Sequence, residues 1–185
     1  MPFFKSLPPD AGPPAVFGKY PELYGAWAQM SEKLMNGPSP LSRGERELIL
    51  AYAAGAAGCR FVCGAHSEVA YALGVEPGTV ERLLEGPQTA NVEPRLKPLL
   101  AYVRKLMTTP GEMMQSDADA VFDAGWDEHA LHDAIAITAR AAFMQRLVEG
   151  HGFVPMSQEL AARRARQRVE RGYVNLYPVF RDKQA

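Results

Sequence analysis

Apolar residues recur at intervals of three and four along most of the chain, which is the spacing of one face of an α-helix. The clearest stripe lies between Glu93 and Met107 and contains Leu96, Leu99, Leu100, Val103, Leu106 and Met107. The same spacing predicts a helix from Pro21 to Asn36, along the stripe Leu23, Trp27, Met30 and Leu34. We find no convincing alternation of period two, the pattern that predicts β-strands. The sequence therefore predicts an all-α fold.

Capping residues and glycines indicate where further helices begin and end. Ser42 and Glu45 have the spacing of a capping box, so a helix is expected to start there and to continue through the apolar run 48–54. Other helices are expected from Cys59 to Leu73, between Pro77 and Gly86, from Ser116, from Asp127 through Leu147, and from Ser157. The order of short and long helices suggests an orthogonal bundle of two helical hairpins with flanking helices.

The distribution of prolines and arginines divides the chain into three parts. Six prolines fall in the first 21 residues, so residues 1–20 are predicted to form an extended arm rather than a helix. Residues 21–155 form the predicted helical domain. Residues 156–185 form an arginine-rich helix and tail, in which Glu159 and Glu170 flank the arginines and no aromatic residues interleave them. This pattern favours a solvated face or a subunit contact over an RNA-binding surface.

Composition narrows the class of protein further. The 185 residues are 47% hydrophobic and 22% charged, and 20 Lys and Arg against 21 Asp and Glu leave a net charge of −1. This balance gives no electrostatic case for nucleic acid or for an anionic membrane surface. No apolar run reaches the roughly 18 residues of a membrane span, and the first residues lack the pattern of a secretory signal. We therefore expect a cytoplasmic protein with neither a nucleic-acid nor a membrane partner.

The two cysteines, Cys59 and Cys63, lie beside a histidine at helical spacing. At about 100° per residue, Cys59, Cys63 and His66 share one face. The start of a helix favours an anion and would lower the pKa of the Cys59 thiol. An imidazole beside Cys63 could accept its proton, and the resulting thiolate could attack a peroxide or a disulfide. These residues therefore predict redox chemistry.

Two other interpretations of these three residues remain open. Free cysteines are among the most buried residue types, and His66 could be a core histidine with satisfied hydrogen bonds. Two thiolates and an imidazole could also ligate zinc, but their spacing differs from that of zinc sites and no third cysteine exists to complete one. We expect no metal and no cofactor.

The residues around these cysteines resemble the alkylhydroperoxidase D-like branch of the carboxymuconolactone decarboxylase family. The likeness rests on the run 41–48, on Gly58-Cys59 and on Gly64-Ala65-His66, with Glu47 nineteen positions before His66. The family motif, a Glu followed by Cys-x-x-Cys-x-x-x-His, aligns with Glu47, Cys59 and His66. Its second cysteine falls on Val62, and Cys63 is the next residue. The likeness is most specific over 41–74 and extends more loosely to 152.

The resemblance implies a thiol-dependent peroxidase or disulfide reductase in which Glu47 and His66 relay protons to the cysteines. Cys59 would then be the proton donor and resolving thiol, and Cys63 would attack the hydroperoxide and pass through a sulfenic acid. A dithiol, such as a lipoyl group or a thioredoxin-like protein, would act as the reductant. The resemblance also implies a homo-oligomer, either a dimer, a trimer or a hexamer.

Three alternatives remain beside this hypothesis. The decarboxylase side of the family acts on a lactone acid and does not depend on a cysteine pair. A non-catalytic helical oligomer, redox-sensing or metal-binding, is the second. The third concerns Glu47, which could lie on the exposed edge of its helix beside Arg43 or Arg46. A break at 55–58 would instead let the next helix fold back, so that Glu47 faces His66.

Overall fold

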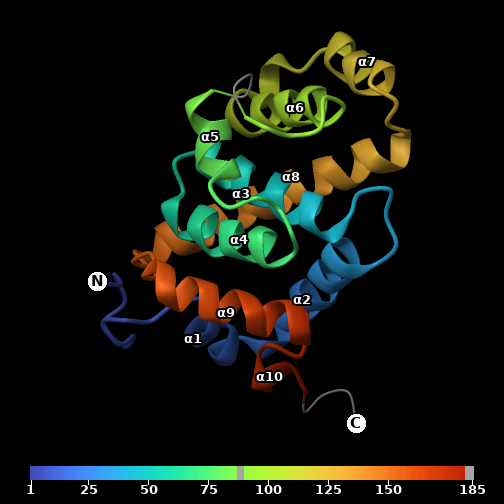
Figure 1. The fold of residues 1–185 in the computed structure, drawn as a ribbon. Coiled ribbons are helices and arrows are strands. Elements are labelled where there is room, and N and C mark those ends of the chain that lie inside the picture. Colours follow the sequence, from blue (N-terminus) through green and yellow to red (C-terminus); the bar gives the residue numbers. More distant parts are fainter. Residues whose placement is uncertain (87–89, 182–185) are drawn as a thin grey trace.

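The computed structural model describes residues 1–86 and 90–181, and these residues form an all-α protein (Figure 1). Residues 182–185, which end the predicted arginine-rich part, lie outside the described residues. The first helices are α1 (Pro13–Lys19), α2 (Pro21–Asn36), α3 (Arg43–Ala56), α4 (Arg60–Ala72) and α5 (Thr79–Glu85). They are followed by α6 (Leu96–Thr108), a 3-10 turn at Pro110–Glu112, α7 (Gln115–Asp123), α8 (Glu128–His151), α9 (Gln158–Arg171) and α10 (Pro178–Arg181).

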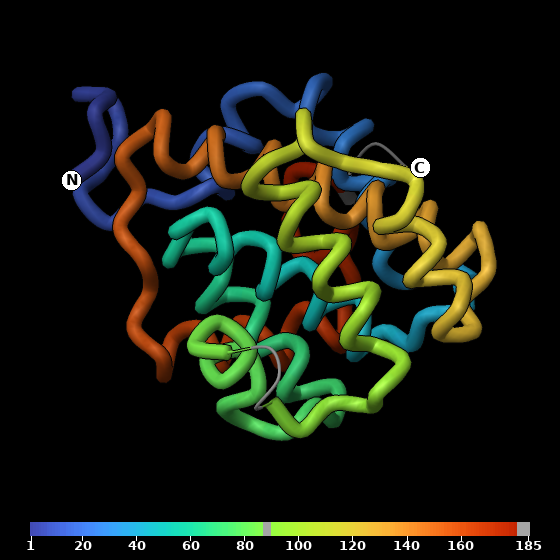
Figure 2. Tube along the Cα trace, turned by 90° about the horizontal axis from the view of Figure 1, so that it is seen from above, coloured from blue at the N-terminus to red at the C-terminus, as the bar shows by residue number. Residues whose placement is uncertain are grey.

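Helix α3 is the centre of the bundle. It packs against α4, α8, α6 and α5, and its residues from Leu48 to Ala54 are almost completely buried. This burial follows from the apolar character of the helix on nearly every side. Helix α4 folds back along α3, and α9 covers the other side of α4 (Figure 1). Seen from above in Figure 2, the long helix α8 crosses the bundle from the side of the N-terminal segment to α7.

Capping side chains start three of the helices as the sequence predicted. The Ser42 hydroxyl accepts from the Glu45 backbone N–H, and the Glu45 carboxylate accepts from the Ser42 backbone N–H, which completes the capping box of α3. The Asp127 carboxylate accepts from the Ala130 backbone N–H at the start of α8, and the Ser157 hydroxyl accepts from the Leu160 backbone N–H at the start of α9. The prediction that Ser116 caps α7 was wrong by two residues: the N-cap is Met114, whose backbone N–H donates to the Asp117 carboxylate.

The N-terminal part differs from the sequence prediction in two respects. Residues 13–19 of the predicted extended arm form helix α1, since Pro13 occupies the first helical position, where a missing N–H costs nothing. In α2, the buried face contains Tyr24, Ala28, Ser31 and Met35. The predicted stripe lies beside that face, and its members Leu23 and Met30 are exposed. The expected homo-oligomer stays a prediction.

Among the described residues, no helix combines the length and the apolar character needed to cross a membrane.

Gly172 determines how the chain leaves α9. Its φ of +71° lies in the region that side chains with a Cβ rarely adopt, and a Cβ there would overlap the Glu32 carboxylate. The turn brings the backbone N–H of Tyr173 onto that carboxylate as a hydrogen-bond donor. Gly172 therefore fixes the position of Tyr173 in the interior.

We expect Gly172→Ala to lower the free energy of unfolding by about 2 kcal/mol, because both the backbone conformation and the contact with Glu32 become unfavourable. Urea unfolding measures this change. Gly150→Ala is the matched control: Gly150 lies in α8 with open space around its Cα, so alanine should be neutral or stabilising there. Equal stability of Gly172→Ala and wild type would contradict the assigned role.

Candidate active site

The turn between α3 and α4 brings Glu47 and His66 together. Gly58 has a φ of +76°, which lets the chain reverse so that α4 runs back along α3. The Nδ1 atom of His66 lies 2.6 Å from Oε2 of Glu47, and both side chains are almost completely buried. The prediction that Glu47 faces His66 is therefore confirmed. The alternative that placed it on an exposed edge beside Arg43 or Arg46 was wrong.

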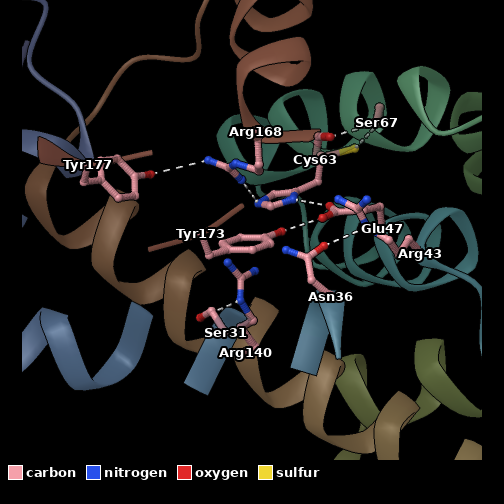
Figure 3. A network of polar contacts seen from close by, with 11 residues as sticks. Ser31, Asn36, Arg43, Glu47, Cys63, Ser67, Arg140, Arg168, Tyr173 and Tyr177 are labelled. Carbon is pink, nitrogen blue, oxygen red and sulfur yellow. Dashed lines mark hydrogen bonds and ion pairs between the residues drawn. The ribbon is translucent and has the colours of Figure 1, made fainter. Parts of the chain in front are cut away.

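Two residues from the C-terminal part, Tyr173 and Arg168, form hydrogen bonds with this pair (Figure 3). The Tyr173 hydroxyl donates to Oε1 of Glu47 at 2.5 Å. The Arg168 guanidinium donates to Nε2 of His66 at 3.1 Å and also lies 3.4 Å from the Tyr177 hydroxyl. Glu47 thus has a hydrogen bond on each carboxylate oxygen, and His66 has one on each ring nitrogen.

These neighbours determine the protonation of His66. A carboxylate only accepts hydrogen bonds and a guanidinium only donates them. The imidazole must therefore be neutral, with its proton on Nδ1 toward Glu47 and its lone pair on Nε2 toward Arg168. Burial, assisted by the positive charges of Arg168 and Arg140, lowers the pKa of His66 to about 4. Although burial by itself would raise the pKa of Glu47, its hydrogen bonds and the nearby cations lower it, so Glu47 is a carboxylate.

A cavity of about 250 Å³ opens onto the network. Its polar lining includes His66, Arg140, Arg168 and Tyr173, and most of the remaining lining is apolar, with Trp27, Phe61, Val62, Val69 and Met144 among it. The guanidinium carbons of Arg140 and Arg168 lie 4.6 Å and 5.0 Å from the centre of the Tyr173 ring. The site therefore combines a neutral imidazole, two cations and an apolar wall.

Cys63 does not line this cavity; it faces the junction of α3 and α5 instead. Its sulfur lies 4.0 Å from the Ser67 hydroxyl, and a Cβ added to Gly55 would lie 3.0 Å from that sulfur. Burial, with a contribution from the charge of Glu81, raises the pKa of the Cys63 thiol. The expectation that His66 accepts the Cys63 proton was wrong, because both ring nitrogens are engaged elsewhere.

Cys59 is the N-cap of α4, is completely buried and does not line the cavity either. Hydrogen bonds from the Val62 and Phe61 backbone lower its pKa, as expected at the start of a helix. Burial and the nearby Glu149 outweigh them and raise the pKa to about 11. The prediction of a lowered pKa was therefore wrong. Both cysteines are free and their sulfurs are not close, so the structure does not place them as a redox pair.

Two arginines of the site were not predicted, although the sequence contains a signal for each of them. In α9, Arg168 follows the buried Ala161 and Ala165 at intervals of four and three, which places it on the inner face. In α8, Arg140 lies on the buried stripe of Ile137 and Met144. An arginine on the apolar stripe of a helix is a candidate for a site, because burying its charge is unfavourable without a partner.

No group of three or more His, Cys, Asp or Glu side chains in residues 1–86 and 90–181 has an arrangement that could hold a metal ion.

Residues 21–105 match the model of the carboxymuconolactone decarboxylase family. This match includes Glu47 and His66 and the turn that joins their helices. Over these residues the chain is similar to that family. Arg140, Arg168 and Tyr173, by contrast, lie beyond the matched residues, so the site also depends on the C-terminal part of the chain.

Two solved structures have the same fold as most of this chain. One is an uncharacterized peroxidase-related protein from Ralstonia eutropha JMP134, described as an alkylhydroperoxidase AhpD core. It has a TM-score of 0.71 and 22% identity, covering 77% of this chain and 75% of that chain. An uncharacterized peroxidase-related protein from Silicibacter sp. TM1040 has a TM-score of 0.70 and 22% identity, covering 78% and 76% of the two chains. No curated protein matches the sequence.

The lowered pKa of His66 predicts how stability depends on pH. As the pH falls from 6.5 toward 4, the unfolded chain takes up a proton on this histidine before the folded protein does, so the free energy of unfolding should fall by up to about 3 kcal/mol. Urea unfolding at several pH values measures the slope. His66→Gln should flatten it, and the exposed His132→Gln should leave it unchanged. Equal slopes in wild type and His66→Gln would contradict the neutral, buried imidazole.

The surroundings of the thiols predict low reactivity. We expect iodoacetamide at neutral pH to label both cysteines at least about tenfold more slowly in the folded than in the urea-unfolded protein, with Cys59 slower than Cys63. Peptide mass spectrometry measures both rates. Peroxide treatment should form no disulfide within the chain. Rapid labelling of the folded protein, or a Cys59–Cys63 disulfide, would show that the thiols are reactive after all.

Proposed function

We propose that the protein is a thiol-independent acid–base enzyme that moves a proton on a small organic substrate, as a lyase or an isomerase does. One observation carries the proposal: His66, which is hydrogen-bonded to Glu47, lines the cavity together with Arg168, and neither cysteine lines that cavity. The decarboxylase side of the family, which does not depend on a cysteine pair, fits this arrangement.

His66 is the proposed general base and acid. Its Nε2 lone pair points to Arg168 at the cavity and its Nδ1–H points to Glu47, so only Nε2 is placed to exchange a proton with a substrate. A neutral imidazole at neutral pH can take a proton directly. The imidazolium that forms would be stabilised by the Glu47 carboxylate and would return the proton to another atom of the substrate.

Arg168 is the proposed stabiliser of negative charge on the substrate. Loss of a proton from a carbon next to a carbonyl group places negative charge on the carbonyl oxygen, and a nearby guanidinium lowers the energy of that state. In the free protein Arg168 donates to Nε2 of His66. A substrate oxygen that accepts from Arg168 instead would free the lone pair, so binding and activation of the base are linked.

Glu47 and Tyr173 position the base. The carboxylate accepts from His66 and from Tyr173, which fixes the tautomer and the orientation of the imidazole. Burial and the negative charge of Glu47 raise the pKa of Tyr173 above its ordinary value. Tyr173 therefore keeps its proton and remains a donor. We assign both residues a positioning role.

A thiol-dependent peroxidase is the second candidate, with a hydroperoxide as substrate and a lipoyl or thioredoxin-like dithiol as reductant. It is favoured by the peroxidase-related names of the two similar structures and by the family spacing of Glu47, Cys59 and His66. In this case Cys63 would attack the peroxide and Cys59 would resolve the sulfenic acid. The mechanism requires α4 to rearrange, because Cys63 faces Gly55 on α3.

Solvent deuterium exchange discriminates between the two candidates. We expect the wild type to introduce deuterium next to the carbonyl group of at least one member of a panel of small lactones, ketones and keto acids, neutral compounds included, as measured by proton NMR. His66→Gln should lower that rate by at least about 100-fold, since it removes the base and retains a hydrogen-bonding side chain.

The double variant Cys59→Ser/Cys63→Ser is the matched control and should retain exchange activity. Consumption of hydroperoxide with a dithiol reductant is measured on the same proteins. A wild type that consumes hydroperoxide faster than Cys63→Ser, and that exchanges no member of the panel, would reject acid–base catalysis in favour of the peroxidase.

A further inference from the structure

Arg140 lies in the cavity but has no part in the proton transfer proposed above. It is only 3% exposed, and it comes from α8, the helix that crosses the bundle. Its Nε donates to the Ser31 hydroxyl at 3.1 Å. This hydrogen bond to a neutral group leaves the positive charge of Arg140 without a hydrogen-bonded carboxylate.

Two aromatic side chains hold the Arg140 guanidinium in place. Its central carbon lies 4.6 Å from the centre of the Tyr173 ring and 4.9 Å from the centre of the Trp27 ring. Figure 3 shows Arg140 and Arg168 on opposite sides of the Tyr173 ring. Arg168 contacts His66, so the two cations serve different parts of one cavity.

Two donor atoms of residues that line this part of the cavity are buried and have no hydrogen-bond partner. One is an Nη atom of Arg140 and the other is the indole Nε1 of Trp27, and both residues line the cavity. A buried donor without a partner is unfavourable by about 1–3 kcal/mol, and by more for a charged group. Burial also lowers the pKa of Arg140, as expected for a cation whose charge is not fully compensated. An acceptor with negative charge that reached these two donors would satisfy both of them and would compensate the charge of Arg140.

We propose that Arg140 and Trp27 form an anchoring subsite for a carboxylate that the substrate carries away from its reacting carbon. A planar carboxylate can accept from a guanidinium and from an indole N–H at the same time. The rest of the lining, with Phe61, Val69 and Met144, suits an apolar body. The inference rests on the proposed function in one respect. It assumes that the reacting carbon of the substrate lies beside His66, on the other side of Tyr173 from Arg140.

Binding measurements test the subsite without turnover. The probes are phenylacetate and benzoate, their neutral amides, and inorganic phosphate, and ligand-detected NMR gives the dissociation constants. We expect the wild type to bind at least one of the carboxylates, and to bind it at least about tenfold more tightly than its amide, because only the carboxylate compensates the charge of Arg140. We expect it to bind phosphate more weakly than the carboxylate.

Three variants locate the binding. Arg140→Met should weaken carboxylate binding at least about tenfold and should fold, since an apolar side chain of similar length often replaces a buried charge without loss of stability. Trp27→Phe keeps the ring and removes one donor, so it should weaken binding by about threefold to tenfold. Arg164→Met is the matched control, because Arg164 also lines the cavity but is exposed and should leave the affinity unchanged.

Four outcomes would overturn the subsite. They are failure of both carboxylates to bind the wild type, equal binding of acid and amide, tighter binding of phosphate, and an effect of Arg164→Met as large as those of Arg140→Met and Trp27→Phe. Because binding needs no turnover, these outcomes are independent of deuterium exchange. Exchange without carboxylate binding would reject the subsite alone, and carboxylate binding without exchange would reject the acid–base function alone.

Discussion

The buried carboxylate of Glu47 is the interaction on which the site depends. It accepts from His66 on the adjacent helix and from Tyr173, which follows 126 residues later in the chain. The carboxylate thereby links α3 and α4 to the C-terminal part, and it fixes the tautomer that leaves a lone pair at the cavity. Glu47 can remain charged in the interior because both of its oxygens are hydrogen-bonded and cations lie nearby.

The two arginines around Tyr173 show how the interior holds positive charge. Arg168 donates to His66 and is close to Tyr177, whereas Arg140 is bonded to a neutral hydroxyl and is held between two rings. A buried charge that its neighbours compensate only in part lowers the free energy of unfolding. Such charges are common where a protein binds a charged ligand. The aromatic rings keep both guanidinium groups in place before a ligand arrives, which lowers the entropic cost of binding.

Cys63 lies one residue beyond the position at which the motif of the family that the chain resembles has its second cysteine. Neighbouring positions on a helix differ in direction by about 100°, so Val62 and Cys63 face different surroundings. Val62 lines the cavity beside His66, and Cys63 faces Gly55 and α5. The contact between Glu47 and His66 is present in spite of this displacement, while Cys63 lies outside the cavity that His66 lines. The acid–base function proposed above therefore uses no thiol.

The sequence by itself determined the all-α class and the caps at Ser42, Asp127 and Ser157, because these depend on local periodicity and on side chains within one helical turn. It left open whether Glu47 faces His66 or solvent, since that depends on how the chain reverses between α3 and α4. It did not determine which neighbours each thiol or arginine meets, since burial and partners are set by helices distant in sequence. Cys59 has a raised rather than a lowered pKa because the fold buries it and because Glu149 of α8 lies nearby. Arg140, Arg168 and Tyr173 became site residues only when α8 and the C-terminal part packed around α4, because the cavity exists only between those elements.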